Sequence, residues 1–228
     1  QGTHENPIVF RGDRLDFILN DILPYDRTPS QWGGIFFRSE SYNNIMDNVI
    51  VRNGKTGLTF EKSSPDESKL KLNNSQITNM GENLFFALDC NIEVTNTELT
   101  NAGGGVVVLI GGEYKFIHCT LANFMTLEKR TTSCLTMANN ANNEAHPLNA
   151  TFDNCIIDGS FDAGKEEYKG ELNLSIDGAA SIEYIFNHCV VKTNGNNNDH
   201  FKEVLFTNVS PSYRLKGGEK NKYRFDFR

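Results

Sequence analysis

Apolar and polar residues follow one another along this chain in a unit that recurs six times. Each unit has an asparagine or histidine two residues after an apolar residue and three residues before another. These central residues, here called the anchors, are Asn48, Asn74, Asn96, His118, Asn154 and His188, spaced 26, 22, 22, 36 and 34 residues apart. A repeat of this length is typical of a solenoid, in which each unit buries its apolar side chains only against its neighbours.

The residues around the anchors indicate which kind of solenoid forms. The apolar positions hold Met, Leu, Val, Phe and Ile rather than the leucine-dominated pattern of leucine-rich repeats, and they show no helical period. We therefore predict an all-β chain that folds as a right-handed parallel β-helix with a corner at each anchor. Because an amide or a neutral imidazole both donates and accepts hydrogen bonds, we expect the anchors to stack as a buried ladder.

A third strand in each coil is indicated downstream of the anchors. Asparagine recurs five residues after the first four anchors, and in the first three units a glycine or asparagine then directly precedes an apolar run. Glycine and asparagine tolerate the left-handed backbone of a tight corner. The recurring asparagines are Asn53, Asn79, Asn101 and Asn123, and the residues before the apolar runs are Gly57, Asn83 and Gly105.

Alternation along this third strand predicts an apolar outer row that includes Phe36, Phe85, Val107 and Leu109. Monomers seldom expose large contiguous apolar patches. We therefore expect residues 11–31 or a further domain to cover this row, or a protein partner or a glycan to bind it. The row contains no pair of carboxylates, which disfavours a polysaccharide-cleaving groove on these strands.

Three segments of the chain resemble a family of right-handed parallel β-helix proteins from Bacteroidota. They are Gly2–Arg14, Gln31–Ile35 and Gly111–Asn123, and the resemblance covers most of residues 1–123. These relatives look mostly like outer-membrane or surface lipoproteins of largely uncharacterised function. The resemblance implies export to the outer membrane or cell surface and a lipid anchor on a segment preceding residue 1. It supplies no catalytic residues.

Length and charge limit the remaining possibilities. The 228 residues suit a single β-helix domain, with regular coils from about residue 32 to about residue 210. Because the ends lack caps, we expect a fragment of a longer exported protein or a partner that covers the ends. The formal charge of −7 argues against nucleic acid, and no apolar stretch is long enough to span a membrane. No cofactor is expected.

Three of the five cysteines, Cys119, Cys155 and Cys189, directly follow consecutive anchors. We expect them to be buried thiols that pack as small apolar residues, with a disulfide or a metal site as the alternatives. The acidic segment 158–170 provides weak Ca²⁺ candidates in Asp158, Asp162 and Glu166, although a solvated acidic loop explains it better.

The favoured function is a non-catalytic, rigid binding or scaffold module for a surface protein or a glycan. The alternative is a polysaccharide lyase or glycoside hydrolase whose acidic residues lie on the segments 158–170 or 11–31. No catalytic residue is identified. His146 has no partner at motif spacing, so we expect an ordinary surface histidine.

Overall fold

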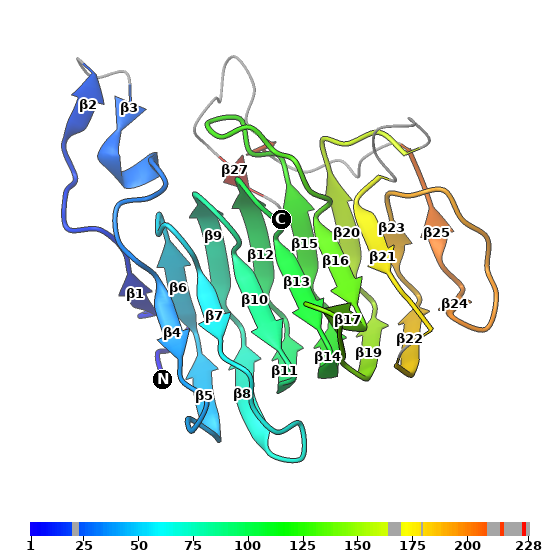
Figure 1. Ribbon diagram of the computed structural model, residues 1–228. Coiled ribbons are helices and arrows are strands. Elements are labelled where there is room, and N and C mark those ends of the chain that lie inside the picture. The colour runs from blue at the N-terminus through cyan, green and yellow to red at the C-terminus, as the bar shows by residue number, and fades with distance from the viewer. Residues whose placement is uncertain (20–22, 164–169, 179, 209–214, 217–224, 227–228) are drawn as a thin grey trace.

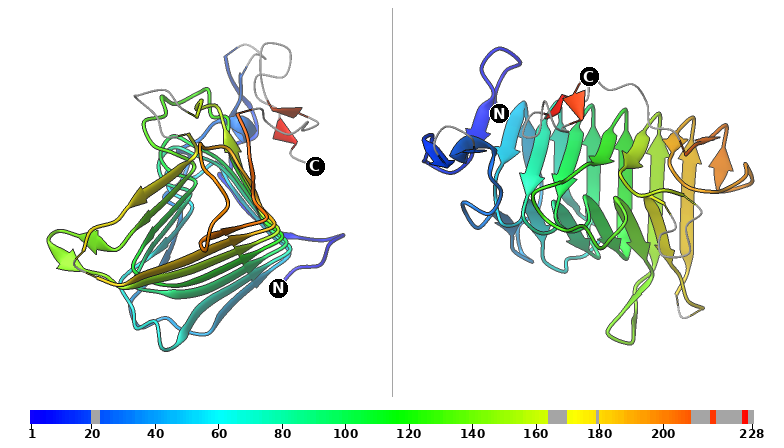
Figure 2. Two further views of the ribbon diagram at one scale, coloured as in Figure 1. Left: turned by 90° about the vertical axis from the view of Figure 1, so that its right-hand side faces the viewer. Right: turned by 90° about the horizontal axis from the view of Figure 1, so that it is seen from above.

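The computed structural model describes residues 1–19, 23–163, 170–178, 180–208, 215–216 and 225–226. In these residues the chain is all-β, and its one helical element is the short 3₁₀ helix η1 (Tyr25–Arg27). Three long parallel sheets dominate the molecule and enclose a roughly triangular cross-section (Figures 1 and 2). The all-β class and the parallel sheets are confirmed, and the arrangement is consistent with the predicted β-helix solenoid.

Successive coils contribute strands in the order sheet 1, sheet 2, sheet 3, so each sheet grows by one strand per coil. Sheet 1 contains β4 (Ile35–Phe37), β7 (Leu58–Phe60), β10 (Phe85–Leu88), β13 (Val107–Ile110), β16 (Leu135–Ala138) and β21 (Leu172–Ser175). Sheet 2 contains β5 (Asn44–Asp47), β8 (Ser68–Asn73), β11 (Asn91–Thr95), β14 (Gly112–Ile117), β19 (Leu148–Asp153), β22 (Ile182–Asn187) and β24 (Phe201–Lys202).

Sheet 3 contains β1 (Ile8–Phe10), β6 (Val49–Arg52), β9 (Gln76–Met80), β12 (Glu98–Ala102), β15 (Thr120–Asn123), β20 (Ile156–Gly159), β23 (Val190–Val191) and β25 (Leu205–Phe206). Three antiparallel pairs lie outside these sheets: β2 (Phe17–Leu19) with β3 (Leu23–Pro24), β17 (Asn140–Ala141) with β18 (Glu144–Ala145), and β26 (Leu215–Lys216) with β27 (Phe225–Asp226).

The anchors form the corner between sheets 2 and 3, as predicted, but they do not form a buried ladder. Each anchor has a left-handed backbone, with φ between 48° and 54°. Asn48 is half-buried and the other five are exposed. Asparagine and histidine are enriched several-fold in this backbone region, so conformation, not burial, explains why both residue types occupy the anchors. The ladder is also partial: Asn96 Nδ2 donates to Asn74 Oδ1 at 3.3 Å, and Asn74 Nδ2 donates to Asp47 Oδ1.

The buried asparagines are those five residues after the anchors, at the corner between sheets 3 and 1. Asn53, Asn79, Asn101 and Asn123 are all at most 7% exposed. Asn79 Nδ2 donates to Asn53 Oδ1 at 2.8 Å, and the Asn101 side chain accepts from the backbone N–H of Phe124. The sequence therefore identified both sets of corner residues but assigned burial to the wrong set.

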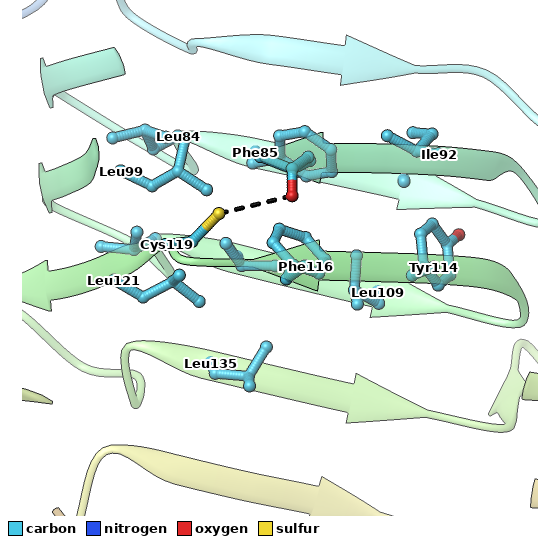
Figure 3. Packing of buried hydrophobic residues seen from close by; sticks show 14 of the residues in the cluster. Leu84, Phe85, Ile92, Leu99, Leu109, Tyr114, Phe116, Cys119, Leu121 and Leu135 are labelled. Atoms are coloured by element: carbon cyan, nitrogen blue, oxygen red, sulfur yellow. Dashed lines mark hydrogen bonds between the residues drawn. The ribbon is translucent and has the colours of Figure 1, made fainter. Parts of the chain in front are cut away.

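Phenylalanine rings run through the core from coil to coil. The column begins on sheet 1 with Phe37, Phe60 and Phe85 and crosses to sheet 2 at Phe116, which lies close to Phe85 (Figure 3). Phe116, Phe152 and Phe186 then stack with centroids 5.0 and 4.7 Å apart. Each coil thus buries its rings against the next coil, as expected of a solenoid.

The three predicted cysteines stack beside this column. Each thiol donates to the backbone carbonyl two residues before it, a geometry that the hydroxyls of Ser75 and Thr97 adopt at the same position in earlier coils. All five cysteines of the chain are buried and free. The neighbouring thiols of Cys119 and Cys189, together with burial, raise the pKa of Cys155, and burial raises the pKa of Cys134. Because nucleophilic chemistry needs a thiolate, these raised pKa values favour packing over reactivity for Cys134 and Cys155.

Candidate functional site

An apolar patch, here called the ledge, lies on part of the outer face of sheet 1, the sheet that faces the viewer in Figure 1. Its side chains alternate with the buried ones along β4, β10 and β13. The ledge consists of Phe36, which is 51% exposed, and the half-buried residues Phe86, Leu88, Val108 and Ile110. Strand pairing places Phe86 beside Val108 and Leu88 beside Ile110, so their side chains form rows across the coils.

Three of the four predicted binding residues are not on this surface. Phe36 is exposed as expected, but Phe85, Val107 and Leu109 are fully buried and point into the core. The sheet pairs Leu58 with Phe85, not with Leu84. The corner before β10 is therefore one residue longer than the corner before β7. A shift of one residue moves every side chain to the opposite face, so the apolar outer row exists but consists of Phe86 and Val108 instead.

A row of charged side chains, here called the rim, borders the ledge where the strands of sheet 1 end. Arg38 pairs with Glu61, and Lys62 lies 3.5 Å from Asp89 and 3.8 Å from Glu144. The hydrogen bond from the Arg38 guanidinium lowers the pKa of the Glu61 carboxyl, so Glu61 remains ionised at neutral pH. The apolar ledge thus ends in fixed charges of both signs.

His146 joins the rim through a contact that its sequence spacing did not reveal. Its Nδ1 lies 2.8 Å from Asp89 Oδ2, and the side chain is buried, so the expectation of a surface histidine is wrong. The backbone N–H of His146 also donates to the carbonyl of Asn139, across the base of the β17–β18 hairpin. His146 therefore holds this hairpin against the rim. The partners are 57 residues apart, and no local motif links them.

Sheet 2 has a polar outer face of different chemistry. A shallow hollow of about 250 Å³ lies on β11, β14 and β19. Its lining includes the carboxylates of Glu93 and Glu113, the ammonium of Lys115 and the amides of Asn91 and Asn149. Strand pairing places Glu93 directly opposite Lys115, with Glu113 two residues earlier on the same strand. Strand spacing and rise then put the two glutamate Cα atoms roughly 8 Å apart.

In the described part of the acidic segment, Asp158 does not belong to the solvated loop that we predict. Asp158 is buried, and its Oδ1 lies 3.8 Å from Lys192 Nζ. Asp162 is exposed, while Glu166 lies outside the described residues. Within the described part of the chain, no group of three or more potential ligands (His, Cys, Asp or Glu) is placed to hold a metal ion.

Two acidic residues of segment 11–31 form ion pairs. Asp16 pairs with Arg14, and Asp26 pairs with both Arg11 and Arg52. Residues 25–31 pack against the corner between sheets 3 and 1, where Asn53 Nδ2 donates to the carbonyl of Asp26. The β2–β3 hairpin lies beyond the N-terminal end of the sheets, away from the ledge (Figures 1 and 2).

A buried ion pair holds the two long connections of the later coils. Arg130 and Glu171 form a two-pronged contact, with nitrogen–oxygen distances of 3.0 and 2.7 Å. The carboxylate also accepts from the backbone N–H groups of Cys134 and Phe161, and the guanidinium lies over the Phe161 ring. Because these partners occupy both charged groups and exclude water, the arrangement supports structure rather than ligand binding.

Comparison of the chain with models of protein families, with curated proteins and with solved structures found no match. Among the described residues, no helix has the length and apolar character needed to cross a membrane.

Proposed function

We propose that this chain is a non-catalytic binding module of the bacterial cell surface, a right-handed β-helix whose ledge docks a protein partner. The observation that carries the proposal is the ledge: apolar side chains in register on the neighbouring strands β10 and β13, with Phe36 beyond Thr59 of the intervening β7, partly exposed and bordered by charges. Interfaces are built in this way, with an apolar centre and a polar rim. Right-handed coiling is the hand that nearly all connections between parallel strands adopt.

Protein suits the ledge better than sugar does. Three of its five residues are aliphatic, and the sheet presents them as a flat surface without a cleft lined by polar groups. An aliphatic surface removes apolar area from water when another apolar surface covers it, whereas a sugar would leave many hydroxyls without partners. Lys62 and Glu144 on the rim can pair with charges of either sign on the partner.

The test uses a photo-crosslinking residue, p-benzoylphenylalanine, in place of Phe86 in the full-length protein in its native cells. The same residue in place of Lys71, on the outer face of sheet 2, is the matched control. We expect one protein to crosslink from position 86 and not from position 71. That protein, once purified, should bind the unmodified module in a calorimeter. The variant Phe36→Ser/Phe86→Ser should bind at least tenfold more weakly, because a few large side chains at the centre of an interface supply most of its binding energy.

Failure to crosslink from position 86, or equal crosslinking from both positions, would refute docking at the ledge. Because both phenylalanines of the double variant lie outside the core, the circular dichroism spectrum should remain that of the native module. That measurement separates lost binding from lost folding.

The second candidate is a glycan-cleaving enzyme, which the glutamate pair on sheet 2 favours. Inverting glycosidases place two carboxyl groups about 6.5–9.5 Å apart. The Cα atoms of Glu93 and Glu113 lie roughly 8 Å apart by strand geometry, so rotation of the two side chains on the same sheet face can bring their carboxyl groups to such a separation. Release of reducing ends from a panel of bacterial and plant polysaccharides tests this activity. Cleavage that disappears in both Glu93→Gln and Glu113→Gln would favour the enzyme over the binding module.

A further inference from the structure

A second hollow, of about 430 Å³, lies along the anchor corner of the solenoid, where sheet 2 meets sheet 3. The anchors Asn48, Asn74 and Asn96 form one side of it, and the first residues of the chain form another. Its volume falls within the range of small-molecule sites, about 300–1,000 Å³. Neither the ledge nor the glutamate pair of sheet 2 contributes to it.

The N-terminal arm, residues 2–7, is fixed in place as a wall of this pocket. The N–H of Gly2 donates to the carbonyl of Asp47 at 2.8 Å, and the N–H of Ile8 donates to the carbonyl of Asn48. Between these attachments, Thr3 and Asn6 exchange two backbone hydrogen bonds of 3.1 Å. The arm therefore closes over the corner as a defined turn.

The polar groups of the pocket are mostly amides, joined by the carboxylate of Glu98, the hydroxyls of Thr3 and Ser75 and the imidazole of His4. Asn74, Asn96 and Gln76 each present an amide side chain. Each of these amides has two N–H donors and one carbonyl oxygen with two acceptor lone pairs. Their contacts with one another are long: Asn96 reaches Asn74 at 3.3 Å, and Gln76 reaches Glu98 at 3.4 Å. Asn74 Nδ2 also donates to Asp47 Oδ1 at 3.0 Å, but the long contacts of Asn96 and Gln76 leave hydrogen-bonding capacity for a ligand that offers both donors and acceptors.

The remaining lining narrows the ligand class. Val49, Ile50 and Pro7 supply apolar surface next to the amides, and the described lining includes no Lys or Arg. Phosphate and sulfate are typically held by such cations, so an anionic ligand would meet the Glu98 carboxylate with only the His4 imidazole to offset it. A sugar ring presents C–H groups on its faces and hydroxyls around its edge, which matches apolar surface beside amides.

We propose that this pocket binds a neutral, hydroxyl-rich sugar unit. The left-handed backbone explains why asparagine occupies the anchor positions, but it does not explain the grouping of Gln76 and Glu98 on neighbouring strands or the arm folded over them. The site is independent of docking at the ledge. If both surfaces act, the module holds a glycan at one corner and a protein on sheet 1.

The test is saturation-transfer NMR on the intact chain with glucose, galactose, mannose and N-acetylglucosamine, and with glucuronate as the anionic comparison. We expect saturation transfer from the protein to at least one neutral sugar and weaker transfer to glucuronate. Asn96→Gly is the informative variant, because glycine keeps the left-handed corner while removing the amide. It should weaken binding several-fold, and Gln76→Ala should do the same.

Asn154→Gly is the matched control, since Asn154 is an anchor with the same backbone (φ 54°) in a later coil and is not part of the pocket lining. It should bind the sugar as the native chain does. The proposal is overturned if no neutral sugar receives saturation at millimolar concentration, if glucuronate binds best, or if Asn154→Gly loses as much binding as Asn96→Gly.

Discussion

In the first four coils, asparagine side chains hold the corner between sheets 3 and 1, whereas in the later coils a buried ion pair holds it. Asn53, Asn79, Asn101 and Asn123 occupy successive coils, and strand pairing then places Gly159 opposite Asn123. A side chain at Gly159 would meet the Glu171 carboxylate, since an added Cβ would lie 2.1 Å from Glu171 Oε1. The ion pair therefore takes the place of the missing amide.

The difference follows from the length of the connections. Between β9 and β10 the chain turns within a few residues, and one uncharged amide per coil reaches the nearby backbone. Residues 124–134 and 160–171 are longer and bury backbone N–H groups at Cys134 and Phe161, for which the Glu171 carboxylate is the acceptor. A buried carboxylate in turn requires a cation, and Arg130 provides it. Longer connections thus replace a neutral corner with a charged one.

The largest expected effect comes from breaking the charged corner. Glu171→Gln leaves Arg130 buried without its counter-charge, so the free energy of unfolding should fall by about 3–5 kcal/mol. Glu82→Gln, which breaks the exposed pair with Lys55, should change it by no more than about 1 kcal/mol. Urea titration followed by circular dichroism measures both. Equal effects from the two variants would show that the buried pair contributes no more than a surface contact.

Phenylalanine stacking provides a second contrast between the two halves. Phe152 has ring neighbours on both sides at 5.0 and 4.7 Å, whereas Phe85 has neighbours at 5.0 and 6.1 Å and meets them at steeper angles. Both Phe→Ala variants should cost about 3–5 kcal/mol. Because close aromatic pairs contribute about 0.5–1.5 kcal/mol beyond their buried area, Phe152→Ala should cost more. Equal unfolding midpoints in urea would contradict this ordering.

The smallest expected effect, at Asn96, distinguishes the two asparagine corners of the early coils. Asn79→Ala places alanine in a left-handed conformation, at about 1–2 kcal/mol, and removes buried hydrogen bonds to Asn53 and Arg27, at about 1–3 kcal/mol more. Asn96→Ala should cost only the first amount, since Asn96 is exposed. Thermal and urea unfolding of the two variants provide the measurement. A larger loss of unfolding free energy for Asn96→Ala than for Asn79→Ala would support a buried ladder of anchor side chains instead.

The sequence was sufficient for the features that recur in every coil. An apolar residue on each side of a polar corner is a local requirement, because a strand buries every second side chain and a left-handed corner favours asparagine, glycine or histidine. The parallel sheets, the anchors at a corner and the stacked cysteines could therefore be predicted. The apolar outer row on sheet 1 could also be predicted as a feature, although not in its register.

Only the tertiary structure decided what depends on the length of a corner or on partners distant in the chain. One additional residue before β10 exchanged Phe85 for Phe86 on the ledge, and no pattern within that strand records the change. Arg130 meets Glu171 across 41 residues and His146 meets Asp89 across 57. These pairs form because the coils stack, so their energetics depend on burial and geometry that arise only after the solenoid is assembled.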